Sequence, residues 1–288
     1  MNDIVKKILS NRTSKIGLII VAFYFAIALL APIIAPPISS DPYIVKQHGF
    51  DIQPKKPSLK YPFGTTQNQY DIFYAMIWGT RLAVKISIAV VFISFIIGLL
   101  LGGVSGYYGG FVDEIIMRFT DTVMSMPSLV LAMVIATVLG PGINNIIIAV
   151  SCVWWPGYAR IFRSEVIRIK NSDFITYSKI LGASSFWIFS KHIIPNSIYT
   201  VLVMASLDIA NVVLIASSLS FLGIGSPEGY ADWGQIISMS RNWIISSFSD
   251  PLLYAHTIFI PSAFIFFFVL GFNLIGESVR DVFDPRIR

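Results

Sequence analysis

Charged residues are absent from five long stretches of the chain, at positions 16–40, 86–112, 122–159, 209–227 and 251–276. A helix rises about 1.5 Å per residue, so about 20 residues cross the ~30 Å hydrocarbon core of a bilayer. The turn signal Gly140-Pro141-Gly142 divides the third stretch into two spans, and Asp208 interrupts a span that runs from about Pro195 to Leu222. The pattern therefore predicts an all-α membrane protein with six transmembrane helices.

The predicted spans divide the chain into four segments. Residues 1–36 form an N-terminal tail and a first anchor helix, 37–80 an external loop, 81–280 a core of five spans with the loop 160–195, and 281–288 a C-terminal tail. The first apolar run is longer than the ~7–15 residues of a signal-peptide core, so we expect it to stay uncleaved. The external segment is rich in proline and reads as a loop, with a short helix expected after Asp71.

Composition agrees with a membrane protein and argues against several functions. Of the 288 residues 55% are hydrophobic and 13% charged, with a mean hydropathy of +0.72. Soluble domains, by contrast, have about a quarter of their residues charged. The sequence contains no phosphate-binding loop, zinc-protease motif or nucleophile elbow, and its three histidines are scattered. We therefore predict no catalytic residue, no metal site and no cofactor bound by this chain, which is not expected to be an enzyme.

Basic residues predict the orientation of the chain. About two thirds of its 21 Lys and Arg residues fall in the segments that are cytoplasmic if the N-terminus lies inside. Basic residues in short loops resist translocation, so we expect both termini on the cytoplasmic side of the cell membrane. The net charge of +5 then reflects topology. Binding to nucleic acid is not expected, because the chain has no soluble basic domain.

The most polar loop between spans covers residues 160–191. Six basic residues stand against two acidic ones there: Arg160, Arg163, Arg168, Lys170, Lys179 and Lys191 against Glu165 and Asp173. The centre of the loop is typical of two short helices separated at Gly182, which tolerates positive φ, and Pro195 suits the first turn of the next span. We interpret the loop as a docking site for a cytoplasmic partner that accepts a short helix in a groove. An ordinary amphipathic loop helix is the alternative.

Four ordered motifs resemble those of one family. They lie in segments 106–127, 173–196, 218–234 and 272–286, which read GYYGGFVDE…MRFTD…MP, DFITYSKILGAS…HIIPN, SLSFLGIG…DWG and FNLIG…RD…DPR. On these motifs the chain resembles the inner-membrane permease subunit, of the second or C type, of the dipeptide, oligopeptide and nickel class of ATP-binding-cassette (ABC) importers. The resemblance extends over nearly the whole chain.

This resemblance implies a type I ABC importer permease fold with a cytoplasmic coupling helix. It implies a pathway for peptides that is shared with a homologous second permease subunit in the membrane lipid and works by alternating access. Two cytoplasmic ATP-binding subunits, which hold ATP and Mg, would dock on the coupling loop, and an extracellular solute-binding protein would deliver substrate. The implied docking residues are Asp173, Phe174, Thr176, Tyr177, Ser178, Leu181, Gly182, Ala183 and Pro195.

Three departures from the family pattern are visible. Thr176-Tyr177-Ser178 stands where Glu-Ala-Ala is usual in the coupling loop, Ala216 stands where an acidic residue is frequent, and the external motif GTDxxGRD is reduced to Gly64, Thr65 and Asp71. Oligosaccharides or a metal complex are therefore alternative cargoes. A secondary transporter, or a purely structural or sensor subunit, is a more distant alternative.

Polar residues within the fifth predicted span are candidates for the translocation pathway: Asp208, Asn211, Ser217 and Ser220. A charge at membrane depth is costly and is by default a functional hypothesis. A structural pairing of Asp208 with Asn211 is equally plausible, and serine hydroxyls that bond helix carbonyls are the alternative for the other two positions.

Two further expectations concern packing. Glycines recur every four residues at Gly98, Gly102, Gly106 and Gly110, which gives one smooth helix face for close contact. Packing within the subunit is favoured for this face over contact with a second subunit. Asp121 is expected to pair with Arg118 one turn earlier on the same helix.

Overall fold

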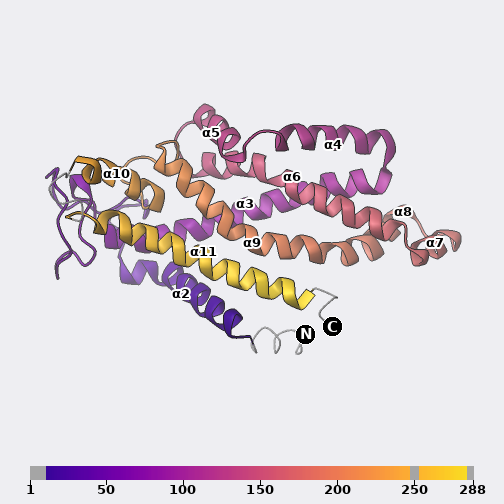
Figure 1. Ribbon diagram of the computed structural model, residues 1–288, viewed down its shortest axis with the longest axis horizontal. Coiled ribbons are helices and arrows are strands. Elements are labelled where there is room, and N and C mark those ends of the chain that lie inside the picture. The colour runs from indigo at the N-terminus through magenta and orange to yellow at the C-terminus, as the bar shows by residue number, and fades with distance from the viewer. Residues whose placement is uncertain (1–10, 247–252, 284–288) are drawn as a thin grey trace.

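The computed structural model describes residues 11–246 and 253–283, and the regular secondary structure in this part of the chain is helical (Figure 1). The long helices are α2 (Arg12–Ile34), α3 (Ile72–Tyr108), α4 (Gly110–Met124), α5 (Ser128–Leu139), α6 (Ile143–Lys170), α9 (Ile194–Phe221), α10 (Trp233–Ser246) and α11 (His256–Phe283). Between α6 and α9 lie α7 (Asp173–Ile180), α8 (Ser185–Ile188) and a π-helical segment, Phe189–Ile193. The predicted tails lie outside the described residues at positions 1–10 and 284–288.

Four described helical segments are long and apolar enough to cross a membrane: Arg12–Ile34, Ile72–Tyr108, Ser185–Phe221 and His256–Asp281. A fifth is present if α4 and α5, which are bent by 89° at the break between them, are counted as one broken span. The remaining predicted span corresponds to α6, whose second half carries Arg160, Arg163, Glu165, Arg168 and Lys170. A multi-pass, all-α membrane protein is therefore observed, with four or five spans by length and apolarity.

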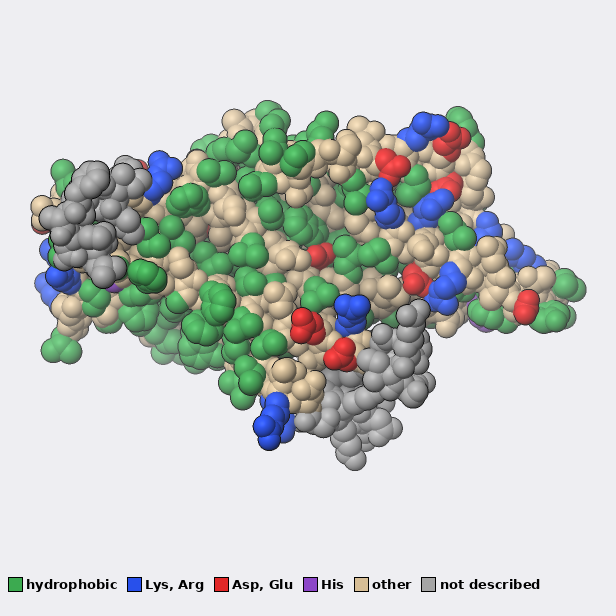
Figure 2. Space-filling model, viewed as in Figure 1, with side chains coloured by type: hydrophobic (Ala, Val, Ile, Leu, Met, Phe, Trp, Pro, Cys, Tyr) green, Lys and Arg blue, Asp and Glu red, His purple; other side chains and the backbone are tan. Residues whose placement is uncertain are grey.

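The helices run side by side along the long axis of the molecule (Figure 1). The α7–α8 segment forms the tip at one end, while residues 35–71 and α10 form the other end. Figure 2 shows hydrophobic side chains over the middle of this face and most charged side chains toward the α7 end, with a few at the opposite end. This distribution is that of a protein with an apolar belt between two polar ends.

Helix α3 begins at Ile72 because Asp71 caps it, its side chain accepting a hydrogen bond from the Tyr74 N–H at 3.1 Å. The expected short helix after Asp71 is thus the start of a 37-residue helix. The predicted boundary between residues 80 and 81 is wrong, since it falls inside α3. The charged residue Arg81 favoured a boundary at this position in the sequence. In the structure its guanidinium lies over the Trp78 ring, 5.5 Å from the ring centre.

Three of the four spaced glycines bring α3 and α6 into close contact. A Cβ placed on Gly98 would lie 2.3 Å from the Tyr158 Cβ, and one on Gly102 would lie 2.3 Å from the Ala159 carbonyl oxygen. Gly106 faces the Arg163 carbonyl oxygen in the same way, at 2.9 Å. The expectation of packing within the subunit is confirmed for these three positions, whereas Gly110 has no neighbour within 4 Å.

The segment predicted to be external packs onto the end of the helices opposite α7, which we call the outer end. Isolated antiparallel bridges join Ile44 to Tyr230 and Gln47 to Tyr70. The Trp78 indole N–H donates to the Ala35 carbonyl at 2.8 Å.

The two helices nearest the chain ends also meet, because Ser14 of α2 donates to Ser278 of α11 at 2.6 Å. The start of α2 and the end of α11 therefore lie together, and these are the ends of the two helices that point toward the α7 side (Figure 1).

Candidate functional site

The tip of the molecule is built by a glycine-terminated helix. Helix α7 ends in a Schellman motif in which the Gly182 N–H donates to the Lys179 carbonyl at 3.0 Å and the Ala183 N–H donates to the Ser178 carbonyl at 3.1 Å. Gly182 adopts φ +82°, as predicted, and no other described residue comes within 4 Å of where its Cβ would lie. Ser184 then caps α8, its hydroxyl accepting from the Trp187 N–H at 3.3 Å. The backbone turn is therefore closed by its own hydrogen bonds and its outer surface is open.

Most of the predicted docking residues lie on the surface of this tip. Leu181 is 86% exposed, and the neighbouring apolar side chains Tyr177, Ile180 and Phe186 are exposed to a similar degree. Asp173, Phe174, Thr176, Gly182 and Pro195 are also exposed, whereas Ser178 and Ala183 are partly buried. An apolar surface of this kind at the polar end of a membrane protein is typical of an interaction site.

The opposite face of the tip is anchored in the core. Ile175, Ile188 and Ile193 are almost completely buried in one cluster with Phe162 and Val166 of α6. The Ser178 hydroxyl is turned back onto its own helix, donating to the Phe174 carbonyl at 2.8 Å. The position that departs from the usual Glu-Ala-Ala thus satisfies its hydroxyl internally and leaves the exposed surface apolar.

Pro195 lies at the second position of α9, close to the expected first turn. The helix does not begin there, however, since helical structure is continuous from Ser185 to Phe221. Proline lacks the N–H that would continue the helical ladder, and the π-helical segment directly before it shifts the hydrogen-bond register. The tip is therefore joined to α9 without an intervening loop.

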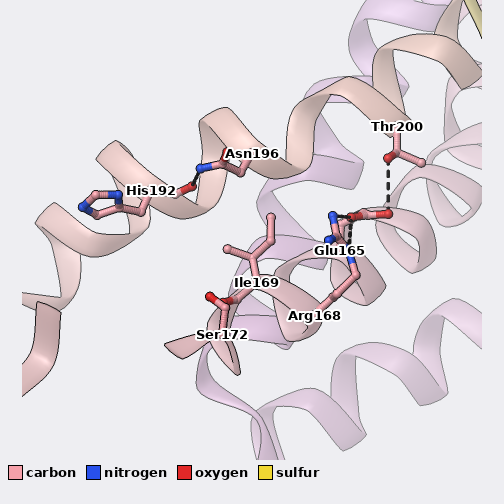
Figure 3. Close-up of polar contacts among 7 residues, drawn as sticks. All are labelled: Glu165, Arg168, Ile169, Ser172, His192, Asn196 and Thr200. Carbon is pink, nitrogen blue, oxygen red and sulfur yellow. Dashed lines mark hydrogen bonds and ion pairs between the residues drawn. The ribbon is translucent and has the colours of Figure 1, made fainter. Parts of the chain in front are cut away.

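One hydrogen bond joins α6 to α9 next to the tip, and further polar contacts support it within each helical segment (Figure 3). Thr200 of α9 donates to one carboxylate oxygen of Glu165 at 3.2 Å, and Arg168 donates to the other oxygen at 2.6 and 3.0 Å. Ser172 and Asn196 donate to main-chain carbonyls on the α6 side and in the π-helical segment, respectively. The two helices that carry the tip are thus fastened to each other.

Helix α4 is clamped to α6 by ion pairs. Arg163 donates to both Asp113 oxygens at 2.5 Å, and Ser105 of α3 donates to the same carboxylate. Arg160 donates to Asp121 at 2.5 Å. The expected pairing of Asp121 with Arg118 is wrong: Arg118 pairs with Glu114 instead, one turn away on the same helix. Because α4 packs on α6, Arg160 of α6 pairs with Asp121 in place of Arg118 of the same helix.

A cleft of about 320 Å³ opens where the chain breaks between α4 and α5. Its walls include Met124 and Met126 at the break, Trp154 on α6, and Met204 and Asp208 on α9. Asp208 therefore reaches a cavity from the middle of a spanning helix. Asn211 is exposed and donates to the Asp208 Oδ1 at 3.3 Å, so these two predicted pathway residues form a pair.

The other two predicted pathway residues lie elsewhere. Ser220 is fully buried and donates to the Asp232 Oδ2 at 2.6 Å, and Ser217 lines a separate cavity of only about 20 Å³ beside Asp232 and Trp233. Neither lines the cleft beside Asp208. The expected set of four is therefore divided between the cleft and the outer end of α9.

Asp232 is the residue that sequence reasoning did not identify as important. Its Oδ2 accepts from Ser220 and Ser226, and its Oδ1 accepts from the N–H groups of Gly234 and Gln235. Burial raises the pKa of this carboxyl, and these hydrogen bonds act in the opposite direction. The available signal was the segment SLSFLGIG…DWG, whose residues meet here; we name this cluster of Ser220, Ser226, Asp232 and Gly234 the outer knot.

Within residues 11–246 and 253–283, no group of three or more His, Cys, Asp or Glu side chains is arranged to hold a metal ion. The absence of a cofactor stays a prediction. The arrangement that the described residues do form is mechanical: an exposed apolar tip, two connected helices and a cleft that these helices line.

Comparisons with known proteins identify the family of this chain. Residues 98–288 match the family described as "Binding-protein-dependent transport system inner membrane component", and residues 1–52 match the "N-terminal TM domain of oligopeptide transport permease C". The chain is 34% identical to the dipeptide transport system permease protein of Alkalihalophilus pseudofirmus, over 98% of this chain and 89% of that protein. It is 32% identical to the oligopeptide transport system permease protein of Bacillus subtilis, over 99% and 90% of the two chains.

Proposed function

Because the chain belongs to the family of binding-protein-dependent transport system inner membrane components, we propose that it is the permease subunit of an ATP-driven importer that moves peptides across the membrane by alternating access. The relatives support peptides as the cargo. They match nearly the full length of this chain, and their names describe dipeptide and oligopeptide transport. No feature of the described cleft favours oligosaccharides or a metal complex over peptides.

The energy for transport comes from partner subunits in this proposal. The sequence contains no phosphate-binding loop, so ATP and Mg are held by two cytoplasmic ATPase subunits. A homologous second permease completes the pathway, and an extracellular solute-binding protein delivers the peptide. This chain contributes binding surfaces and motion, and catalyses no hydrolysis itself.

One observation carries the proposal: the exposed apolar tip is built on the same two helices that line the cleft. α7 follows α6 directly in the chain, and helical structure continues from the tip into α9 without a break. Glu165 and Thr200 join the two helices beside the tip. A partner that grips Leu181 and its neighbours therefore moves Trp154 and Asp208 when it moves the tip, because packed helices transmit displacement as rigid elements.

We place the tip and both termini in the cytoplasm. The start of α2 and the end of α11 are the ends of these two helices that point toward the tip, and the loop 160–191 carries the largest excess of basic residues. Both features agree with the positive-inside rule. The folded external segment and the outer knot then face the solute-binding protein.

The test is reconstitution of the whole complex in proteoliposomes, with the solute-binding protein outside and ATP inside. We expect uptake of a labelled peptide that requires ATP and stops when the ATPase subunits are omitted. Gradient-driven uptake by this chain without those subunits would identify a secondary transporter. ATPase activity that does not respond to peptide and binding protein would identify a structural or sensor subunit.

A further inference from the structure

The cleft between α4, α5, α6 and α9 has an apolar wall with one charged group. Met124, Met126 and Met204 line it together with Trp154, and Ser128 adds a hydroxyl. Asp208 is the sole charged residue among the described residues that line it. The cleft thus offers a flexible apolar surface around a single carboxylate.

This carboxylate is not neutralised by the chain. Asp208 is 6% exposed, and none of the five ion pairs among the described residues includes it. Its Oδ1 accepts a single long hydrogen bond from Asn211, and its Oδ2 accepts no well-aligned hydrogen bond from a described residue. The Tyr158 hydroxyl and the Trp154 side chain lie near the carboxylate, but neither of them carries a positive charge.

A buried charge without a partner is one of the costliest features of a membrane helix, so ionisable residues at this depth generally face a pathway or meet an opposite charge. Both oxygens of a carboxylate are acceptors, so its ligand must be a donor, and a cationic donor also neutralises the buried charge. A divalent cation needs about six oxygen ligands, and one carboxylate with one hydroxyl does not supply them. A primary ammonium group needs only the carboxylate and gains from an aromatic face such as that of Trp154.

The surrounding side chains identify what accompanies the ammonium group. Methionine is unbranched and adaptable, and surfaces rich in it accept apolar groups of different shapes. Three methionines on two elements therefore suit a ligand whose charged group is constant and whose side chains vary. Peptides have this property, since each carries an ammonium group next to a variable side chain.

We propose that Asp208 is the receptor for an ammonium group of the transported peptide, with its Oδ2 as the acceptor and the methionine-lined cleft as the seat of the adjoining side chain. This inference rests on the proposed peptide transport and adds a site to it. The ammonium group comes from the peptide N-terminus or from a lysine side chain, which share the same chemistry.

The experiment measures equilibrium binding of three peptides to the purified complex of permeases and ATPases without the solute-binding protein, so that the specificity of that protein does not enter. The peptides carry the same C-terminal fluorophore and have a free N-terminus, an acetylated N-terminus, or an acetylated N-terminus with a lysine. We expect the wild-type complex to bind the free peptide about tenfold more tightly than the acetylated peptide, as for one charge-assisted hydrogen bond. Tight binding of the lysine peptide shows that any ammonium serves, and weak binding restricts the site to the N-terminus.

The decisive variant is Asp208→Asn, which keeps the shape and removes the charge. We expect it to abolish the preference for the ammonium group while binding of the acetylated peptide stays unchanged. Asp208→Glu retains the charge and is expected to retain the preference. Glu277→Gln is the matched control, since it removes an exposed carboxylate on α11 that does not line the cleft.

Three results would overturn the inference. One is a wild-type complex with no preference, and another is a preference that survives Asp208→Asn. The third is loss of assembled complex in Asp208→Asn on size-exclusion chromatography with retention in Asp208→Glu, which would mean that Asp208 pairs with a cation of the second permease. ATP-driven uptake of the free peptide is measured separately in wild type; its presence keeps the proposed function even when the site at Asp208 fails.

Discussion

The two ends of the molecule are packed in opposite ways. At the outer end, a Cβ placed on Gly234 would lie 2.0 Å from the Ser217 carbonyl oxygen, and one on Gly225 would lie 2.1 Å from the Ser220 hydroxyl. At the tip, a Cβ on Gly182 would meet no described residue within 4 Å, and Leu181 beside it is the most exposed apolar side chain of the tip. The glycines of the outer knot are therefore closely packed within this chain, whereas the turn at the tip is open.

Two carboxylates repeat this contrast at equal burial. Asp232 and Asp208 are each 6% exposed. Asp232 accepts four hydrogen bonds, three from members of the outer knot and one from the Gln235 N–H, whereas Asp208 accepts one, from Asn211, and no described residue makes a well-aligned hydrogen bond to its Oδ2. Burial alone therefore does not distinguish a structural acid from a functional one. The distinction lies in whether the chain itself satisfies the buried group.

The largest expected loss of stability comes from a substitution in the closely packed outer knot. In Gly234→Ala the added methyl group meets the backbone of α9, which has no room to move, so we expect a loss of about 3 kcal/mol or failure to assemble. Thermal denaturation of the purified complex measures it. Gly157→Ala is the control, because its Cβ meets only the flexible end of Met204 at 3.0 Å. Equal melting temperatures for the two variants would contradict the comparison of closed and open regions.

The next effect tests whether Asp232 is structural. Asp232→Ala leaves two buried hydroxyls and two backbone N–H groups without their acceptor, and we expect a loss of on the order of 3 kcal/mol. In Asp232→Asn the amide oxygen still accepts from Gly234 and Gln235, while the hydroxyls of Ser220 and Ser226 rotate to accept from the amide nitrogen. We expect a loss of less than about 1 kcal/mol for this variant. A large loss in both variants would show that the charge itself is required.

The stability of the wild type relative to Asp232→Asn is expected to depend on pH. Burial raises the pKa of Asp232, so the folded state retains this proton to a higher pH than the unfolded state. The free energy of unfolding contributed by the group is therefore highest at low pH and declines as pH rises from the ordinary aspartate range through the raised pKa. We expect the difference in melting temperature between wild type and Asp232→Asn to follow this decline. A difference that is independent of pH would contradict it.

A substitution at Gly182 tests the tip, and its expected effect on ATPase activity is intermediate in size. Gly182→Trp places a bulky group on the docking surface at a residue with φ +82°, and we expect at least about a tenfold loss of peptide-stimulated ATPase activity, or ~1.4 kcal/mol of coupling, with insertion intact. Gly182→Asn is the matched control, since asparagine tolerates left-handed backbone and adds little bulk. Normal stimulation in Gly182→Trp would remove the docking role from the tip. Equal loss in both variants would assign the effect to the turn instead.

The smallest effect concerns the ion pairs of α4. Arg118 and Glu114 are largely exposed, so Arg118→Ala is expected to cost no more than about 0.5 kcal/mol. Arg163 is less exposed and holds Asp113 by two hydrogen bonds between different helices, so Arg163→Ala is expected to cost about 1 kcal/mol or more. Melting temperatures of the two variants compare the pairs directly. The reverse order would show that α4 is not held by α6.

Local properties of the chain could be predicted without its structure. Long uncharged stretches indicate membrane helices, Gly182 indicates a left-handed turn, and the spacing of Gly98, Gly102 and Gly106 indicates a smooth helix face. Each depends on backbone geometry or on helix periodicity, which act over a few residues. The ordered motifs identified the family for a similar reason, because they occur as continuous segments.

Contacts between distant segments were decided only by the tertiary structure. Asp121 and Arg160 lie 39 positions apart and meet because α4 packs on α6, so the nearer Arg118 was the wrong partner. Ser220 is held by Asp232 for the same reason, and the Asp208 Oδ2 is left without a well-aligned hydrogen bond from a described residue. The sequence by itself determined a multi-pass helical protein with a glycine-broken polar loop. How many hydrogen bonds each of the two buried acids accepts depends on the groups that packing brings within about 3 Å, and no local pattern specifies those.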